Sequence, residues 1–245
     1  MDPIEPPANY AIWRLCAWAG PVFLLTLTVA FAGIGKFFPP PLESWSPDEV
    51  YRFYLENSFR IRLGMDLSNM SLPLYMVFSV FLSRVMMRAE GRDGIMSSVE
   101  LAGGVLTTVA GLCAFTLFLS AGFDTAAKAP TDIKAMSDLG WMFFNATVGV
   151  TIMQLMAVGV GFLSDRRTVP LVPANVCWFS FGCAAFELIA LLPPFFNHGP
   201  FAWHGMMAFY VVLSTFFIWT LVIFYFTLKA VGRLEAEASS RATMA

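Results

Sequence analysis

The chain of 245 residues is 58% hydrophobic and 16% aromatic but only 13% charged, and its mean hydropathy is +0.67. A soluble domain carries about 25% charged residues, so this composition indicates an all-α integral membrane protein. The net charge of -2 leaves no basic patch to neutralise phosphates, which excludes a nucleic-acid-binding function.

Six apolar segments are long enough to cross the hydrocarbon layer of a membrane, which takes about 20 helical residues. They are 13–35, 61–86, 96–123, 139–163, 171–196 and 201–228. Short polar joints separate most of them, so we expect a six-transmembrane-helix bundle in a single membrane domain, 13–228. An N-terminal segment, 1–12, precedes this domain and a tail, 229–245, follows it.

The basic residues predict how the bundle is oriented. They gather in the second joint, the fourth joint and the tail, at Arg84, Arg88, Arg92, Arg166, Arg167, Lys229, Arg233 and Arg241. Short loops rich in Lys and Arg stay in the cytoplasm, so both 1–12 and 229–245 are expected to be cytoplasmic.

The long first loop contains a helix signal of its own. Ser46-Pro47-Asp48-Glu49 combines a Ser cap, a Pro at the first helical position and an acid at the third, which is a capping-box pattern. Apolar residues then follow at helical spacing, opposite charged ones. We predict an extracytoplasmic amphipathic helix at about 46–60, which either shields the bundle or controls ligand access.

The stretch 186–205 concentrates residues that are costly in a membrane. Glu187 lies inside an apolar run, Pro193-Pro194 is expected to break the helix, and His198 and His204 follow. An acid at the bilayer centre costs roughly 2.5 kcal/mol or more unless it is paired, so it is a functional-site hypothesis by default. A ligand-binding pocket around Glu187 is therefore expected.

Other polar residues share the outer half of the membrane in the predicted orientation. Asp66 and Asn69 lie one turn apart in the second span, and Asn145 lies in the fourth. We predict one pocket, open to the outer side, that is lined by Asp66, Asn69, Asn145, Glu187, His198, Trp203 and His204. Glu187 and Asp66 are the candidates for any catalytic role.

Structural explanations stay open for several of these residues. Asp66 could pair with Arg62 one turn back, both histidines could be interfacial, and Gln154 is expected to join helices. Glu100 lies about one turn from the cytoplasmic boundary, so we expect it to reach water and to lie outside the site. The aromatic residues of the last span are expected to face lipid or the core.

Neither a metal nor a cofactor is expected. The four cysteines fall in apolar runs without metal-binding spacing, and every lysine lies in a loop or at a helix boundary, where it cannot bind retinal. The two histidines are too close in sequence to hold a haem between facing helices. No phosphate-binding loop motif is present either.

Two stretches resemble one protein family. W-S-P-D-E at 45–49, F-Y at 53–54 and I-R-x-G-M ending at Met65, with N-H-G-P-F-A-W-H-G at 197–205, are similar to an uncharacterised family of bacterial six-helix integral membrane proteins. The resemblance covers most of the chain. It implies this architecture in a bacterial cytoplasmic (inner) membrane, but no activity. Asn is common at the position of His204 in that pattern, so it implies no obligatory catalytic or metal role there.

Three functions remain open. The first is binding and transport or handling of a hydrophobic or amphipathic small molecule or lipid, with Glu187 and Asp66 fixing its polar end or exchanging protons, because burial favours the neutral form of a carboxyl group. The second is a membrane enzyme in which the same two carboxyl groups act as acid and base on an apolar substrate. The third is an accessory subunit that binds a protein partner, and a homo-oligomer also stays open.

Overall fold

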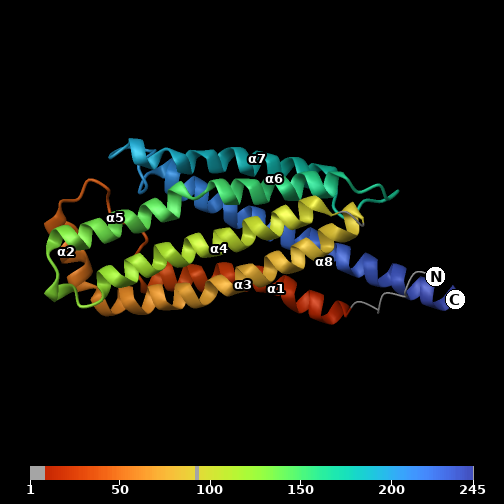
Figure 1. Ribbon diagram of the computed structural model, residues 1–245, viewed down its shortest axis with the longest axis horizontal. Coiled ribbons are helices and arrows are strands. Elements are labelled where there is room, and N and C mark those ends of the chain that lie inside the picture. The colour runs from red at the N-terminus through yellow and green to blue at the C-terminus, as the bar shows by residue number, and fades with distance from the viewer. Residues whose placement is uncertain (1–8, 92–93, 245) are drawn as a thin grey trace.

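The computed structural model describes residues 9–91 and 94–244, which form an elongated bundle of helices (Figure 1). Within these residues, six helical spans are long and apolar enough to cross a membrane: Tyr10–Ile34, Ser58–Glu90, Ile95–Gly122, Pro130–Leu163, Ala174–Phe195 and Met206–Ser240. The predicted six-helix bundle is therefore confirmed. Residues 1–8 of the predicted N-terminal segment, Arg92 and the side chain of Arg241 lie outside the described part.

The spans combine regular α-helices with shorter helical pieces. The second and third spans are the uninterrupted helices α3 (Ser58–Glu90) and α4 (Ile95–Gly122). The first consists of α1 (Tyr10–Leu27) and the π-helix η1 (Thr28–Ile34), and the fourth of α5 (Pro130–Ala146) and α6 (Gly149–Leu163). The fifth consists of α7 (Ala174–Glu187) and the 3-10 helices η3 (Leu188–Leu191) and η4 (Pro193–Phe195), and the sixth of the π-helix η5 (Met206–Val211) and α8 (Val212–Met244).

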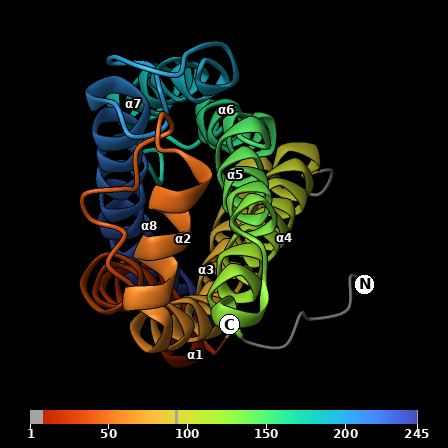
Figure 2. The ribbon, with the colours of Figure 1, turned by 90° about the vertical axis from the view of Figure 1, so that its left-hand side faces the viewer.

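The six spans form a closed ring when the bundle is seen from one end (Figure 2). Each span packs on the next in the order α1, α3, α4, α5 with α6, α7 and α8, and α8 packs back on α1. At one end, Tyr10 Oη donates a hydrogen bond to Leu234 O at 3.3 Å and Arg14 forms an ion pair with Glu235. We call this the terminal end, because α1 begins and α8 finishes there, and we call the opposite one the α2 end.

The predicted surface helix is α2 (Pro47–Glu56), which lies across the α2 end of the ring (Figure 2). The capping box is complete, because Ser46 Oγ accepts a bond from Glu49 N and Ser46 N donates to Glu49 Oε2 at 2.7 Å. Hydrogen bonds from Ser46 lower the pKa of Glu49. The buried Tyr54 anchors α2 on α5, with Tyr54 Oη 3.2 Å from Ser137 Oγ.

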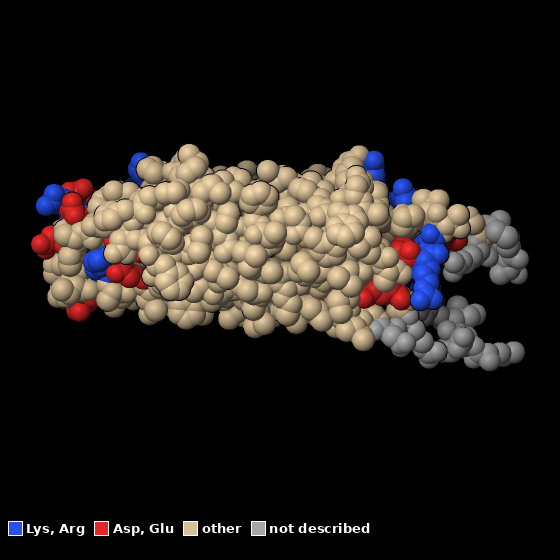
Figure 3. Space-filling model, turned by 90° about the horizontal axis from the view of Figure 1, so that it is seen from above, with Lys and Arg blue, Asp and Glu red and all other residues tan. Residues whose placement is uncertain are grey.

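On the face shown in Figure 3, charged side chains lie near the two ends of the molecule and leave a broad uncharged belt between them. Exposed apolar side chains such as Leu25, Met70 and Trp178 occur along this belt. Such a surface is unfavourable in water and suited to hydrocarbon. The chain is accordingly a multi-pass membrane protein.

Candidate functional site: a cavity around Glu187

The ring surrounds a partly open cavity with a volume of about 120 Å³, several times the space that one water molecule needs. Every span contributes to its mostly apolar wall. Representative lining residues, one from each span in chain order, are Phe23, Tyr75, Gly111, Phe144, Glu187 and Phe216.

Four of the six spans change their helical geometry beside this cavity. The lining includes Leu27 where α1 passes into η1, Val148 between α5 and α6, Glu187 at the end of α7, and Val212 where η5 passes into α8. Irregular backbone at membrane depth is tolerated where it is buried in protein or lines a cavity. Broken helices and π-helical turns also recur at binding sites. The backbone therefore indicates a built site rather than a packing defect.

The break between α5 and α6 has an identifiable local cause. Asn145 Nδ2 donates to Trp141 O at 2.8 Å, and Thr147 Oγ1 donates to Phe143 O at 2.7 Å. Side chains that bond to carbonyl groups of the preceding turn weaken the helical ladder, and Gly149 is a poor helix former. The sequence analysis predicts one uninterrupted span here, so it misses a signal that the run from Asn145 to Gly149 contains.

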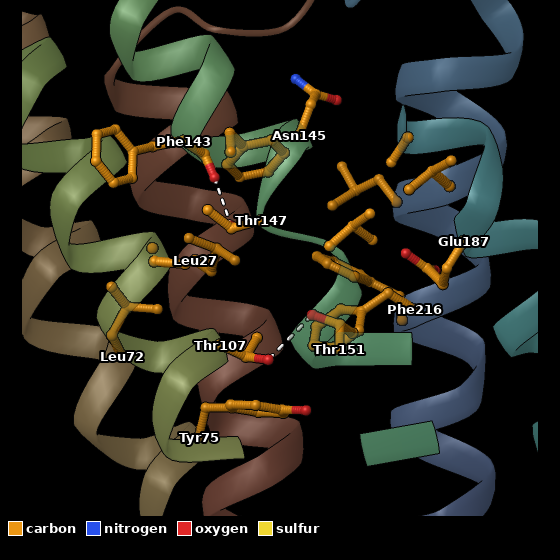
Figure 4. Close-up of a pocket in the computed structure, with 18 of the residues that line it drawn as sticks. Leu27, Leu72, Tyr75, Thr107, Phe143, Asn145, Thr147, Thr151, Glu187 and Phe216 are labelled. Carbon is orange, nitrogen blue, oxygen red and sulfur yellow. Dashed lines mark hydrogen bonds between the residues drawn. The ribbon is translucent and has the colours of Figure 1, made fainter. Parts of the chain in front are cut away.

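Glu187 is the one acidic residue among the described residues that line the cavity. It is only 2% exposed, its carboxyl group points into the cavity (Figure 4), and Oε1 has no hydrogen-bond partner in the described structure. Helical rise places it about 20 Å along the span from the start of α7. The α-helix already ends at Glu187, so the irregular part of this span begins before the predicted break at Pro193-Pro194.

Aromatic and hydroxyl side chains form the rest of the inner surface. The ring of Tyr75 lies 5.1 Å from that of Phe23 and 5.4 Å from that of Phe216. The hydroxyl oxygens of Thr107 and Thr151 are 3.0 Å apart, between α4 and α6 (Figure 4). Phe216 belongs to the aromatic residues that the sequence analysis assigns to lipid or core, but it lines the cavity.

A buried polar network closes the cavity on the side of the terminal end. Tyr75 Oη donates to Gln154 Oε1 at 2.7 Å, and Gln154 Nε2 donates to Glu100 Oε1 at 2.9 Å and to Ser79 Oγ at 3.0 Å. Gln154 thus joins α3, α4 and α6. Glu100 is fully buried, so the prediction that it reaches water is wrong: its side chain turns inward to the amide of Gln154.

The other predicted pocket residues on α3 lie away from the cavity. The Asp66 side chain is exposed and forms no hydrogen bond or ion pair within the described residues, including with Arg62. Asn69 Nδ2 is 3.5 Å from Thr116 Oγ1, and neither Asp66 nor Asn69 lines the cavity. Of the residues predicted to form one pocket, the structure brings Asn145 and Glu187 together there.

Trp203 and His204 instead belong to a closure at the α2 end, while His198 is exposed. The ring of Trp203 stacks on Trp141 at 5.9 Å, and Trp203 Nε1 donates to Pro41 O at 3.0 Å. Glu43 N donates to His204 Nδ1 at 3.2 Å, and Trp203 N donates to Glu43 Oε2 at 3.3 Å. Burial raises the pKa of Glu43 and lowers that of His204. We call Pro41, Glu43, Trp203 and His204 the loop clasp.

No protein-family model, curated protein or solved structure matches this chain. Within the described residues, no group of three or more His, Cys, Asp or Glu side chains could hold a metal ion.

Proposed function

We propose that the protein binds a hydrophobic or amphipathic small molecule in this cavity and transports or handles it in the membrane, with Glu187 contacting its polar end. The aromatic and aliphatic wall supports an apolar body for this ligand. The hydroxyl groups of Thr107 and Thr151 are further polar contacts at the wall.

One observation carries this proposal: Glu187 is buried, points into an apolar cavity and has an oxygen without a partner. Buried polar groups are normally hydrogen-bonded, and an unsatisfied one costs about 1–3 kcal/mol. An acid kept in hydrocarbon at such a cost indicates a function. A ligand that pairs with Glu187 would supply the missing contact.

We further propose that the terminal end faces the cytoplasm and that the membrane is a bacterial cytoplasmic one. Arg84, Arg166, Arg167 and Arg233 lie near the terminal end of their helices or in the joint beside it, as the positive-inside rule requires. The cavity then lies beyond the membrane midpoint along the fifth span, and the loop clasp faces the outside.

The two-carboxylate enzyme is less well supported by this geometry. It requires both acids at one substrate, and the exposed Asp66 does not line the cavity. The same placement makes Asp66 a useful control, since it is a carboxyl group in a span but outside the candidate site.

The proposal is tested by native mass spectrometry of the purified protein together with analysis of its organic extract. We compare the wild type with Glu187→Gln, which removes the ionisable group at almost constant volume, and with Asp66→Asn as the matched control. A third variant, Ala190→Phe, places a bulky ring on a residue that lines the cavity.

We expect a defined hydrophobic molecule to copurify with the wild type and with Asp66→Asn. It should be lost from Ala190→Phe and reduced in Glu187→Gln. If all four proteins carry the same species, the cavity is not the binding site. Wild-type protein without any bound small molecule would favour the accessory-subunit function, especially if Glu187→Gln is as stable as the wild type.

A further inference from the structure

The cavity wall combines many aromatic rings with a single acidic side chain. Among the described residues that line it there are eight aromatic side chains and one carboxyl group, but no Lys, Arg or His. The aromatic residues are Phe23, Tyr75, Phe115, Phe143, Phe144, Phe209, Phe216 and Phe217. The only ionisable or aromatic side chains that the described wall offers are therefore acidic or carry a negative ring face, and none of them is basic.

These aromatic side chains line the same cavity as Glu187. Figure 4 shows Phe216 and the Glu187 carboxyl group at the same cavity, and the rings of Phe216 and Tyr75 are 5.4 Å apart. The face of an aromatic ring carries partial negative charge and attracts a cation, most strongly where water is excluded. The unpartnered Glu187 oxygen and the ring faces thus favour the same kind of ligand.

From this arrangement we infer that the ligand is a lipophilic organic cation, an amine or ammonium group on an apolar body, whose charge pairs with the Glu187 carboxylate. The inference rests on the proposed function and specifies its ligand class. An anion would meet a carboxyl group and ring faces with no basic partner, while a neutral hydrocarbon would leave the Glu187 oxygen unpaired. A cation alone among these satisfies both features.

Binding of the cation then displaces a proton from Glu187. In the empty cavity the neutral Glu187 carboxyl group retains its proton, since burial disfavours the charged form. When the cation enters, the O–H bond breaks, the proton leaves to water, and the carboxylate pairs with the cation. The cavity has no net charge before or after this exchange, so neither state buries an unpaired ion.

The residues around Glu187 decide which group a released proton comes from. Cys183 on α7 and Tyr75 on α3 interact electrostatically with Glu187, and η5, which packs on η3, contains the titratable Tyr210. Helix α6 carries no titratable residue, and neither does the stretch 212–224 of α8, although both helices pack on α7. A proton released on ligand binding is therefore assigned to Glu187.

The test uses phenylbutylamine, phenylbutanol and phenylbutyrate, which share one apolar body and differ in the charge of the head group. Isothermal titration of the purified full-length protein in detergent measures each affinity. We expect the amine to bind the wild type at least about tenfold more tightly than the alcohol, with the carboxylate weakest, because a desolvated cation gains both the ion pair and the ring faces. Glu187→Gln should bring the amine to the affinity of the alcohol, and Asp66→Asn should match the wild type.

A second measurement needs no variant and remains informative if Glu187→Gln does not fold. Because a proton and the cation compete for Glu187, amine affinity should fall as the pH is lowered, while alcohol affinity stays constant. Equal affinities for amine and alcohol, a pH-independent ratio, or no amine binding would each overturn the cation inference. Tight alcohol binding with no preference for the amine would refute the cation inference but leave the proposed function intact. If none of the three probes binds and the wild type copurifies no ligand, both the cation inference and the proposed function are refuted.

Discussion

Adding one methyl group at Gly104 tests whether the polar network below the cavity holds the bundle together. A Cβ atom at this position would lie 2.1 Å from Ser79 Oγ and 2.8 Å from Gln154 Nε2. Both neighbours are fully buried, so neither side chain can swing into solvent. Gly104→Ala must therefore push α3 and α6 away from α4 or break the hydrogen bond between Ser79 and Gln154.

The size of the effect follows from these contacts. Overpacking a close-packed core costs about 1–3 kcal/mol, and a hydrogen bond between membrane helices contributes about 0.6 kcal/mol. Together they predict a loss of about 2–4 kcal/mol, which lowers the melting temperature by roughly 4–16 °C in a chain of this length. Tyr75 should also lose its fixed position, since Gln154 holds its hydroxyl group.

The assay is scanning fluorimetry of the purified variant in detergent, with Gly182→Ala as the matched control. Gly182 is also a glycine within a membrane helix, but a Cβ atom there meets no atom within 4 Å. We expect Gly182→Ala to melt at or above the wild-type temperature. If Gly104→Ala melts together with this control, α4 does not approach α3 and α6 as closely as the structure indicates, and the role assigned to the network fails.

Three further predictions concern single contacts. Ser46→Ala removes the cap of α2 and should cost about 1 kcal/mol in thermal unfolding, whereas Ser46→Asp should preserve stability. Glu100→Gln retains an oxygen acceptor for the Gln154 amide and should be tolerated, whereas Glu100→Leu should cost about 1–3 kcal/mol because that amide loses one of its two buried acceptors. At the loop clasp, burial lowers the pKa of His204, so the unfolded chain binds more protons than the folded one as the pH falls below about 6.5, and acid should destabilise the clasp. Burial raises the pKa of Glu43, which acts in the opposite direction at lower pH. His204→Asn retains an acceptor for Glu43 N without titrating, so its stability relative to the wild type should increase on acidification. An unchanged difference across the pH range would contradict the assignment of His204 Nδ1 as the acceptor.

The sequence predicts best those features whose cause is local or compositional. Six spans follow from runs of apolar residues, and the start of α2 follows from Ser46 and Glu49, which interact with each other within one turn. Glu187 can also be singled out, because an acid in an apolar run is costly in a membrane, and the structure places it in the cavity wall. These inferences require no knowledge of which helices are neighbours.

Predictions are less reliable where they depend on which face of a helix points into the bundle. Asp66 and Glu187 share one half of the predicted membrane, but α3 turns Asp66 outward, and depth alone does not define a side-chain direction. Conversely, Glu100 near a helix end turns inward because Gln154 of α6 meets it there. The lining residue Phe216 illustrates the same limit, since an aromatic residue suits lipid and a cavity wall equally well.

The two closures of the cavity differ in how much of the bundle must move to open them. At the terminal end, Gln154 joins three spans through fully buried groups, so opening would separate α3, α4 and α6.

At the α2 end, the loop clasp joins two connecting loops, through Pro41 and Glu43 on one side and Trp203 and His204 on the other. Loops with few buried apolar contacts open at lower free energy than packed helices do. Trp203 is the exception within this clasp, because its stacking on Trp141 must also be released. A ligand that enters from the α2 end would therefore displace one aromatic contact and a few hydrogen bonds, without separating the ring of spans. For the proposed function, this asymmetry favours ligand exchange at the α2 end, with the Gln154 network as the fixed side of the cavity.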